Sequence, residues 1–306
     1  MQRYLGRRLL GMIPAVLLVL FLVMLVVDLI PGDPIVLMLG ENAKQEQVDA
    51  LRKFYGFDKP MPIRYVQYVG RLLRGDLGRS LRENRAVVET LRDVWPNTLK
   101  LTSAAFIIAA IVGVVAGVIS AARPYGLVDN IIRVASFFGL SMPVFWTGLT
   151  LIYWLSFRLR WFPVGGTGSW RHVVLPALTL AGPSIAILAR MTRSSVLEIM
   201  GEDYIRTARA KGLPERSVMF KHALRSALIP LVTVMGLQCG QMLGGSILTE
   251  TVFGWTGLGR LATQAIFARD YVLLQGAILV MALSFMLINL VVDVSYALLD
   301  PRTRYS

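Results

Sequence analysis

Long apolar segments are the feature that most constrains this sequence. A bilayer core of about 30 Å needs ~20 apolar residues, because a helix rises 1.5 Å per residue. The composition agrees, since 55% of the 306 residues are hydrophobic and 17% are charged, whereas about a quarter of a soluble domain is charged. The expected fold is therefore an all-α polytopic membrane protein. Six apolar spans are predicted, at about residues 9–30, 98–121, 132–157, 173–191, 226–248 and 273–298.

The first span could also belong to a signal peptide, because Arg3, Arg7 and Arg8 precede it. However, its apolar run is longer than that of a signal peptide, and PGDP follows it instead of an A-x-A cleavage site. We therefore expect an uncleaved transmembrane helix.

Two features inside the spans predict local geometry. Pro143 lies in the third span, and proline lacks the amide donor that a helix interior requires, so a kink or a break is expected there. Pairs of glycines four residues apart let helices approach closely in lipid. Such pairs are Gly113 with Gly117, Gly236 with Gly240, and Gly240 with Gly244.

The basic residues predict the orientation. If the N-terminus is inside the cell, fifteen of the 32 Lys and Arg residues lie in cytoplasmic segments and five lie in the two short outer loops. The other twelve lie in the long segment 31–100, and segments of more than ~60 residues largely escape the positive-inside rule. Both termini are therefore expected in the cytoplasm.

The long outer segment 31–100 contains two amphipathic patterns. In the first, Val48, Leu51 and Phe54 recur at three-residue steps, and in the second, Val66, Val69 and Leu72 or Leu73 do so. Both patterns predict short helices, which could lie on the membrane surface or contact another protein.

Several kinds of chemistry find no support in the sequence. It has no GxxxxGK[ST] phosphate-binding loop and no HExxH zinc motif, and no GxSxG motif has the setting of a nucleophile elbow. His172 and His222 are far apart, and Cys239, the single cysteine, lies in an apolar run. The net charge of +13 is explained by the residues that flank membrane helices, so no nucleic-acid binding is expected.

A dense polar block, EDYIRTARAKGLPERSVMFKH at residues 202–222, separates the fourth and fifth spans. Glu202 and Asp203 suit the start of a short helix and Lys211 suits its end, as the helix dipole requires. Gly212 is a natural left-handed stop, and Pro214 suits the first turn of a second helix that enters the fifth span. This helix–turn–helix is either an ordinary basic cytoplasmic loop or a docking site for a cytosolic protein.

Polar residues within or beside the spans are further candidates. Gln238 and Gln241 could line a pathway or could hydrogen-bond between helices. Asn289 and Asp293 lie four residues apart in the sixth span, and Asp293 is expected to pair with a cytoplasmic arginine. Glu250 and Arg260 are candidates for an outer gate or for contact with a solute-binding protein.

The polar block and its continuation, EDYIRTARAKGLPERSVMFKHALRSALIP, resemble the cytoplasmic loop of binding-protein-dependent ABC importer permeases. In the general family pattern, Gly212 and Ala208 match, whereas Arg206 and Thr207 replace a glutamate and an alanine. The form ARAKGL followed by HALR is that of the dipeptide/oligopeptide/nickel subgroup. Further segments similar to that subgroup are LIPGDP (29–34), GDLGRS (75–80), ARMTRSSVLE (189–198), ILTETVFGWTGLGRL (247–261), RDY (269–271) and NLVVDVSYALLDPRTRY (289–305).

The resemblance is greatest to the first of the two permeases in such systems, including glutathione importer permeases, and it implies a type I ABC importer transmembrane domain with six helices. The resemblance also implies three parts. Residues 1–93 would form an N-terminal transmembrane helix and an extracytoplasmic segment with short amphipathic helices. Residues 94–298 would form the transmembrane domain, with a coupling loop at about 194–225, and residues 299–306 would form a cytoplasmic tail. A coupling helix would sit in a cleft of the ATPase subunit, with Ala208 and Gly212 at its tightest points. Its residues would be Tyr204, Ile205, Arg206, Thr207, Ala208, Arg209, Ala210, Lys211, Gly212 and Leu213.

The implied function is that of a non-enzymatic permease subunit in a bacterial inner membrane. Its partners would be a second homologous permease, two ATPase domains that hold the ATP and Mg, and an extracytoplasmic solute-binding protein. Alternating access would move di- or oligopeptides or related solutes, and the sequence leaves peptide, glutathione, nickel chelate and opine open. The alternatives are a secondary transporter or channel acting alone, and an intramembrane enzyme, for which no nucleophile–base or metal constellation is present.

Overall fold

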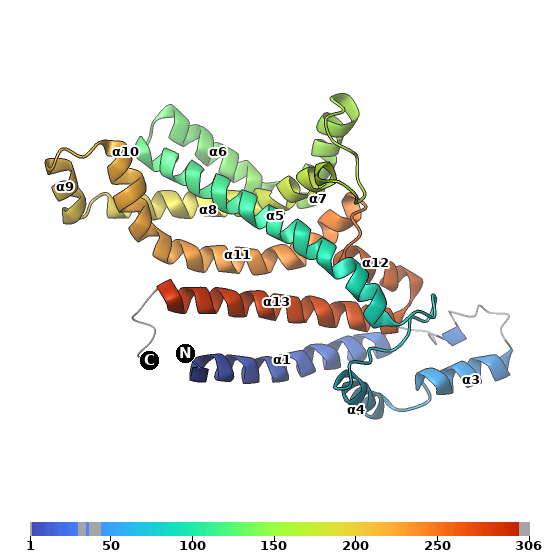
Figure 1. Cartoon of the computed structure of the whole chain (residues 1–306). Helices are drawn as coiled ribbons and strands as arrows, with labels where there is room; N and C mark the ends of the chain where they lie inside the picture. The colour runs from blue at the N-terminus through green and yellow to red at the C-terminus, as the bar shows by residue number, and fades with distance from the viewer. Residues whose placement is uncertain (1, 30–34, 37–43, 300–306) are drawn as a thin grey trace. The chain divides into compact units, whose positions relative to one another are not determined.

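The computed structural model describes residues 2–29, 35–36 and 44–299, and helices dominate the described part (Figure 1). Residues 30–34 of the LIPGDP motif and residues 300–306 of the C-terminal segment lie outside it. The helices are α1 (Gln2–Leu29), α3 (Gln45–Tyr55), α4 (Met61–Leu72), α5 (Val87–Ala122), α6 (Leu127–Ser141), α7 (Val144–Leu151), the π-helix η1 (Ile152–Arg158), α8 (Trp170–Ile199), α9 (Asp203–Ala210), α10 (Glu215–Ser217), the π-helix η2 (Val218–Ala223), α11 (Leu224–Val252), α12 (Leu258–Ala268) and α13 (Tyr271–Leu299).

Five helical segments in the described part are long and apolar enough to cross a membrane. They are Arg8–Leu29, Val87–Ala122, Trp170–Ile199, Pro230–Val252 and Tyr271–Val292. A bent pair, Leu127–Ser141 with Val144–Arg158, gives a sixth span if it crosses as one unit. The prediction of an all-α polytopic membrane protein is confirmed.

The predicted break at Pro143 is also confirmed. The helices on either side of Met142 and Pro143 are bent by 109°. Pro143 occupies the N-cap of α7 with φ −58°, a position where its missing amide donor costs no helical hydrogen bond. The third apolar segment is therefore two helices joined at a sharp corner.

Some helices extend well past the predicted spans. α5 begins at Val87, although the apolar run was predicted to begin near residue 98, and α8 ends at Ile199 instead of near residue 191. The apolar run marks only the stretch that suits lipid. Backbone hydrogen bonds from residue i to i−4 continue through the polar residues on either side, so the helix is longer than the apolar run.

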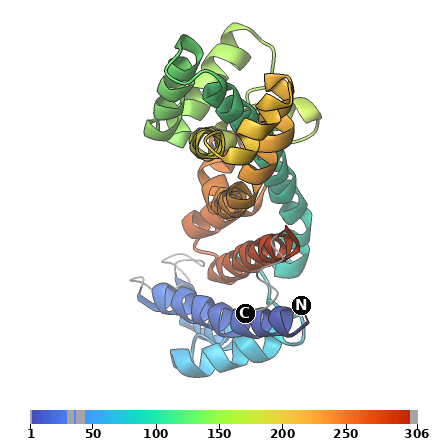
Figure 2. The same ribbon diagram turned by 90° about the vertical axis from the view of Figure 1, so that its left-hand side faces the viewer.

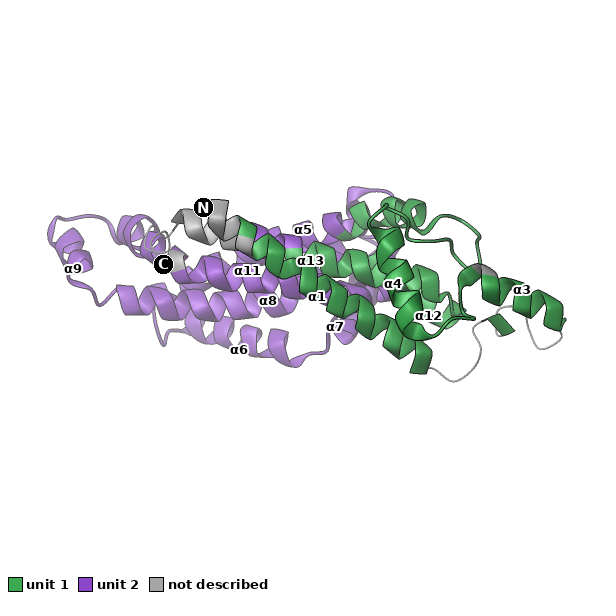
Figure 3. Ribbon diagram, turned by 90° about the horizontal axis from the view of Figure 1, so that it is seen from below, with its two compact units in different colours: residues 1–98, 256–286 green, residues 99–255, 287–306 purple. Residues whose placement is uncertain are grey.

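Contacts divide the chain into two compact units, unit 1 (Met1–Thr98 and Thr256–Met286) and unit 2 (Leu99–Trp255 and Leu287–Ser306) (Figure 3). The sequence did not predict that residues 256–286 group with the N-terminal segment. The core of unit 1 is drawn from α1, α4, the start of α5, α12 and α13. Its buried members include Leu20, Met24, Tyr68, Leu91, Leu258 and Leu274.

The two amphipathic helices are present as α3 and α4, and the residues that α4 packs inside unit 1 differ in part from its predicted apolar stripe. Val66 is 68% exposed and Leu73, just after the helix, is 83% exposed. The residues that join the unit 1 core are Met61, Tyr65, Tyr68 and Leu72. Their spacing of four, three and four residues makes one helical stripe, and two of its members are tyrosines, which the apolar pattern did not count.

Unit 2 is organised around α8. The helices α6, α7 and α11 all pack against it, and α11 lies alongside it (Figures 1 and 2). One buried cluster joins α5, α8 and α11 and includes Leu101, Ala105, Leu180, Leu188 and Met242.

Two of the glycine pairs include positions of close helix approach. A Cβ on Gly113 would lie 2.7 Å from the Cβ of Leu188 on α8, closer than real side chains pack. A Cβ on Gly117 would lie closer still to the Cβ of Thr192, which is also on α8. A Cβ on Gly236 of α11 would lie closest of the three to its neighbour, a methyl carbon of Val292 on α13. Gly244 has nothing within 4 Å, so it serves no such contact among the described residues.

Candidate functional site

The polar block between α8 and α11 folds as the sequence predicts. α9 (Asp203–Ala210) has Glu202 at its N-cap and Asp203 in its first turn, and Lys211 follows at its C-cap. The next segment, α10, begins after Pro214 and continues through η2 into α11. The first helix is thus short, exposed at most positions, and separated from the bundle by a turn at either end.

Two side chains fix α9 to the rest of unit 2. Ile205 is fully buried and Ala208 is 6% exposed. They enter a cluster with Val118 and Ala121 of α5 and Val196 of α8. Val218, Met219 and Ala223 of η2, and Ala227 and Leu231 of α11, complete that cluster. Burying an isoleucine side chain is worth about 1.5–3 kcal/mol, so this contact holds α9 in a defined position.

The turn after α9 depends on Gly212. Its φ is +75°, in the left-handed region, where residues with a Cβ are disfavoured. Its amide donates to the carbonyl of Arg209 at 2.9 Å, and the amide of Leu213 donates to Ala208 at 3.4 Å. A Cβ at Gly212 would meet nothing within 4 Å. The requirement for glycine is therefore conformational and not a matter of space within this chain.

A salt bridge closes the same turn. Arg209 donates to Glu215 through Nε at 3.2 Å and through one terminal nitrogen at 2.7 Å. This two-pronged contact lowers the pKa of the Glu215 carboxyl below its ordinary value of 4.5. The turn between α9 and α10 is thus held by a glycine conformation and by an ion pair.

The exposed surface of α9 differs from the one predicted. Ala208 was expected at the tightest contact with a partner, but its side chain faces the chain's own core. The surface left open to another protein comprises Tyr204, Arg206, Thr207, Arg209, Ala210, Lys211, Gly212 and Leu213. Tyr204 is tied back to α11, since its hydroxyl lies 3.0 Å from the Ser226 hydroxyl.

Among the polar residues in the spans, Gln238 of α11 forms a hydrogen bond with α8. It is 6% exposed, accepts a hydrogen bond from the Ser184 hydroxyl of α8 at 2.8 Å, and donates to Gln241 at 3.2 Å. Gln241 is exposed on α11. Asn289 is half-buried in α13, and the side chain of Asp293 lies outside the described residues.

Glu250 and Arg260 fall in different units. Glu250 is fully buried at the end of α11, so its side chain does not form part of an open surface of unit 2. Arg260 is half-buried in α12 of unit 1.

A buried ion pair in unit 2 was missed by the sequence reasoning. The guanidinium of Arg193 on α8 donates to both carboxylate oxygens of Asp129 on α6, at 2.7 and 2.8 Å. Asp129 also accepts from the amide of Tyr125 at 2.8 Å and from the Ser120 hydroxyl of α5. An acidic residue at the edge of an apolar run is the signal that could have drawn attention to Asp129.

In unit 1, two of the motifs noted in the sequence meet. Ser80, the last residue of GDLGRS, donates a hydrogen bond to the carboxylate of Asp270 in RDY. Asp270 also accepts from the amide of Leu273 at 3.1 Å, and therefore caps the start of α13. Arg82 donates to the carbonyl of Ala268 at 3.0 Å. Ser80 and Asp270 are 190 positions apart, so a single sequence could not show that these residues meet.

The described residues contain no group of three His, Cys, Asp or Glu side chains that could hold a metal ion. His172 has a structural role, because its ring Nδ1 lies 2.9 Å from the Ser169 hydroxyl in a capping box at the start of α8. Cys239 is a half-buried free thiol.

Comparison with known proteins places the chain among transport proteins. The family described as "Binding-protein-dependent transport system inner membrane component" matches residues 113–305, and its N-terminal companion matches residues 1–102. The glutathione transport system permease proteins GsiC of Escherichia coli and of Pectobacterium atrosepticum are each 43% identical over 305 residues, which is 100% of both chains.

Solved structures agree on the fold. One inward-facing crystal form of the MetNI methionine ABC transporter matches with a TM-score of 0.58 at 19% identity, covering 69% of this chain and 96% of that one. A second crystal form matches with a TM-score of 0.53 at 22% identity, covering 70% and 94%. At this identity the likeness shows a shared fold, that of a type I importer transmembrane domain. The chain belongs to the binding-protein-dependent transport system inner membrane components, within the dipeptide/oligopeptide subgroup, and is a non-enzymatic, multi-pass permease subunit of an ABC importer.

Proposed function

We propose that α9, with the turn at Gly212, is the coupling helix through which a separate ATPase moves this permease. The segment Tyr204–Leu213 would dock into a cleft of the ATPase subunit. The observation that carries this proposal is the anchoring of α9: Ile205 and Ala208 join one buried cluster with α5, α8, η2 and α11. A push or pull on the exposed side of α9 would therefore reach three long helices at once.

The proposed direction of transport requires α9 in the cytoplasm, together with both termini. The distribution of Lys and Arg supports this orientation. In the same orientation, residues 1–93 form a transmembrane helix with an extracytoplasmic segment, residues 94–298 form the transmembrane domain, and residues 299–306 form a cytoplasmic tail.

The partners follow from what a subunit of this family needs for ATP-driven import. We infer a second homologous permease, two ATPase domains that bind ATP and Mg, and an extracytoplasmic solute-binding protein. Closure of the ATPase domains on ATP would pull α9 and shift the spans between inward-open and outward-open states, which is alternating access. The fixed turn at Gly212 and the Arg209–Glu215 ion pair would keep the docked helix from yielding under load.

The proposed cargo is a di- or oligopeptide or a glutathione-like solute. It is supported by relatives of equal length that are named for glutathione transport. Gln241 is the better candidate for lining the pathway, because it is exposed on α11 whereas Gln238 is engaged with Ser184.

Replacement of Gly212 tests the coupling role. Gly212→Val would force a β-branched residue into positive φ and distort the turn. The matched control is Gly75→Val, since Gly75 has φ +77° and a Cβ added there would also have nothing within 4 Å, but it lies far from α9 in the sequence and in unit 1. Both variants would be reconstituted with their partner subunits at equal abundance.

We expect Gly212→Val to reduce ATP-driven uptake by more than about tenfold, and to leave ATP hydrolysis uncoupled from solute, because the docked helix no longer transmits the movement. Gly75→Val should retain most uptake. Equal uptake by Gly212→Val and the wild type would contradict the coupling assignment.

A further inference from the structure

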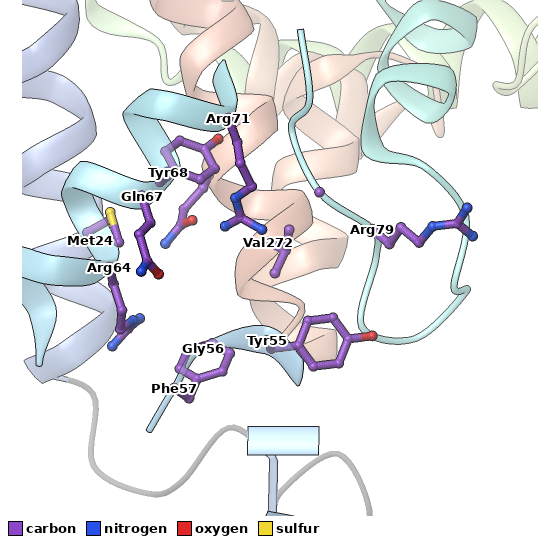
Figure 4. A pocket seen from close by; sticks show the side chains of 12 residues that line it. Met24, Tyr55, Gly56, Phe57, Arg64, Gln67, Tyr68, Arg71, Arg79 and Val272 are labelled. Atoms are coloured by element: carbon purple, nitrogen blue, oxygen red, sulfur yellow. The ribbon is translucent and has the colours of Figure 1, made fainter. Parts of the chain in front are cut away.

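A small polar pocket lies in unit 1. It is enclosed by the ends of α1 and α3, by α4, by the loop at residues 78–79 and by the start of α13 (Figure 4). Its lining includes three arginines, Arg64, Arg71 and Arg79, together with Tyr68 and Gln275. No acidic side chain is among the described residues that line it. The pocket lining is therefore rich in hydrogen-bond donors.

Two of the three arginines already have partners. Arg64 forms an ion pair with Asp28 at 2.6 Å and lies over the ring of Phe57. Arg79 donates to the carbonyl of Asn84 at 3.2 Å, and Figure 4 shows its side chain directed away from the pocket.

Arg71 differs from both. Its guanidinium carbon lies 5.9 Å from the centre of the Tyr68 ring, and its side chain forms no ion pair or hydrogen bond with the residues that the structure describes. Figure 4 shows it reaching from α4 toward Val272, across the pocket. Arg71 is exposed, and a guanidinium that has no carboxylate partner can bind an anionic acceptor.

Tyr68 supplies a second unmet donor. The residue is 2% exposed, and its hydroxyl has no hydrogen-bond partner within the described ranges. Burial raises its pKa to about 12, so the hydroxyl keeps its proton at neutral pH. A buried hydroxyl without a partner destabilises the folded protein, and an incoming acceptor would offset that cost. Gln275, 6% exposed, adds an amide that no described side chain bonds.

The size of the pocket limits the ligand. Its interior has room of about 50 Å³, and one water molecule needs about 10–15 Å³ of such room. A group of a few heavy atoms fits, whereas a whole peptide does not.

We propose that this pocket binds a single carboxylate group, held by the Arg71 guanidinium, the Tyr68 hydroxyl and the Gln275 amide. The carboxylate belongs either to the solute or to an acidic side chain of the extracytoplasmic binding protein. The choice between these two sources rests on the proposed function, because the pocket is extracytoplasmic only if both termini are in the cytoplasm. The binding of a carboxylate to the pocket does not depend on the proposed function.

The test uses the full chain in lipid nanodiscs with the subunits that co-purify. The probe is sodium trifluoroacetate, observed by fluorine NMR line broadening at fixed chloride, with neutral trifluoroacetamide as the comparison. The variants are Arg71→Gln and Tyr68→Phe. Arg74→Gln is the matched control, since Arg74 is exposed like Arg71 and follows α4 by two residues, but does not line the pocket.

The wild type and Arg74→Gln should bind trifluoroacetate equally and should ignore the amide. Arg71→Gln should weaken binding by more than about tenfold and Tyr68→Phe by about three- to tenfold, as expected for a charged and a neutral hydrogen bond. Equal broadening in Arg71→Gln and Arg74→Gln, or equal binding of the amide, would overturn the proposal.

Two further arms identify the source of the carboxylate in the reconstituted transporter. A raised KM for a dipeptide in Arg71→Gln, with normal docking of the binding protein, assigns the carboxylate to the solute. Weaker docking of the binding protein, loaded or empty, assigns it to the partner. If trifluoroacetate binds but Arg71→Gln changes neither the KM nor the docking of the binding protein, the pocket holds an adventitious ion only. That result would also overturn the proposal. A wild-type complex that fails to transport would contradict the proposed function while leaving the trifluoroacetate result intact.

Discussion

Arg193 of α8 and Asp129 of α6 form a two-pronged ion pair, with nitrogen–oxygen distances of 2.7 and 2.8 Å. The Asp129 side chain is fully buried and that of Arg193 is 19% exposed. Because Asp129 also accepts from Ser120 and from the amide of Tyr125, one carboxylate connects α5, the turn after it, α6 and α8.

Breaking this pair should destabilise the protein strongly. Asp129→Asn or Arg193→Gln leaves a buried charge without its partner, at a cost of about 3–5 kcal/mol. Thermal unfolding in detergent measures the loss. The double variant should lose less than the sum of the single losses, since neither charge is then stranded. Asp203→Asn is the control, because its ion pair with Arg206 is exposed and is worth at most about 1 kcal/mol. Similar losses in Asp129→Asn and Asp203→Asn would contradict this interpretation.

The contact between Ser80 and Asp270 should hold the loop before α5 against the start of α13. Ser80→Ala strands a buried carboxylate oxygen and should cost about 1–3 kcal/mol. Limited proteolysis should then cut residues 73–86 faster than in the wild type. Thr263→Ala removes a hydroxyl that donates to the Gly259 carbonyl of its own helix at 3.0 Å, and should leave the cleavage rate unchanged. Unchanged cleavage in Ser80→Ala would show that the loop is held by other contacts.

The anchoring of α9 predicts a defect in coupling from a buried substitution. Ile205→Ala opens a cavity beneath α9 and should cost about 2–5 kcal/mol of local stability, so the helix loosens. Uptake per ATP hydrolysed should fall severalfold. Ile63→Ala makes the same chemical change at a side chain that is 48% exposed on α4, and its ratio of uptake to hydrolysis should stay normal. A normal ratio in Ile205→Ala would mean that α9 does not depend on this anchor.

The turn after α9 should loosen in acid. The pKa of Glu215 is lowered in the folded protein by Arg209, so the ion pair contributes fully at pH values above the ordinary 4.5 and is lost as the pH falls through the lower folded value. A spin label at position 211, in a Cys239→Ala background, should become more mobile as the pH falls below 4.5. With Glu215→Gln the label should be mobile throughout. A label whose mobility does not change with pH in the wild-type turn would refute the role of the ion pair.

The contact between α5 and α8 should not tolerate a side chain at Gly113. A Cβ there would lie 2.7 Å from that of Leu188, and both neighbours belong to packed helices, so Gly113→Val should cost about 1–3 kcal/mol or more. Gly244→Val, in a comparable span with nothing within 4 Å, should be much milder. Thermal unfolding of the two variants compares them directly, and equal stability would show that the helices can separate at little cost.

The sequence was most informative where local chemistry decides the structure. The break at Pro143, the left-handed turn at Gly212 and the close approach at Gly113 all follow from what single residues can adopt. It did not show which residues of α4 pack inside unit 1, because Tyr65 and Tyr68 bury rings that an apolar pattern does not count.

Contacts between side chains that are far apart in the chain could not be predicted from the sequence. Ser80 with Asp270, and Asp129 with Arg193, join residues whose neighbourhood is set only once the helices have packed. The placement of Ala208 shows the same limit. Its small side chain was consistent with contact to a partner or to its own core, and only the packing of Ile205, Val218 and Leu231 around it decides for the core.

The most direct test of the central claim is solute accumulation in proteoliposomes that contain this chain and its second permease, with and without the ATPase subunits. The account predicts uphill accumulation only when the ATPase subunits and ATP are both present, and predicts that Gly212→Val lowers it by more than about tenfold. Uphill accumulation by the permeases alone would contradict it.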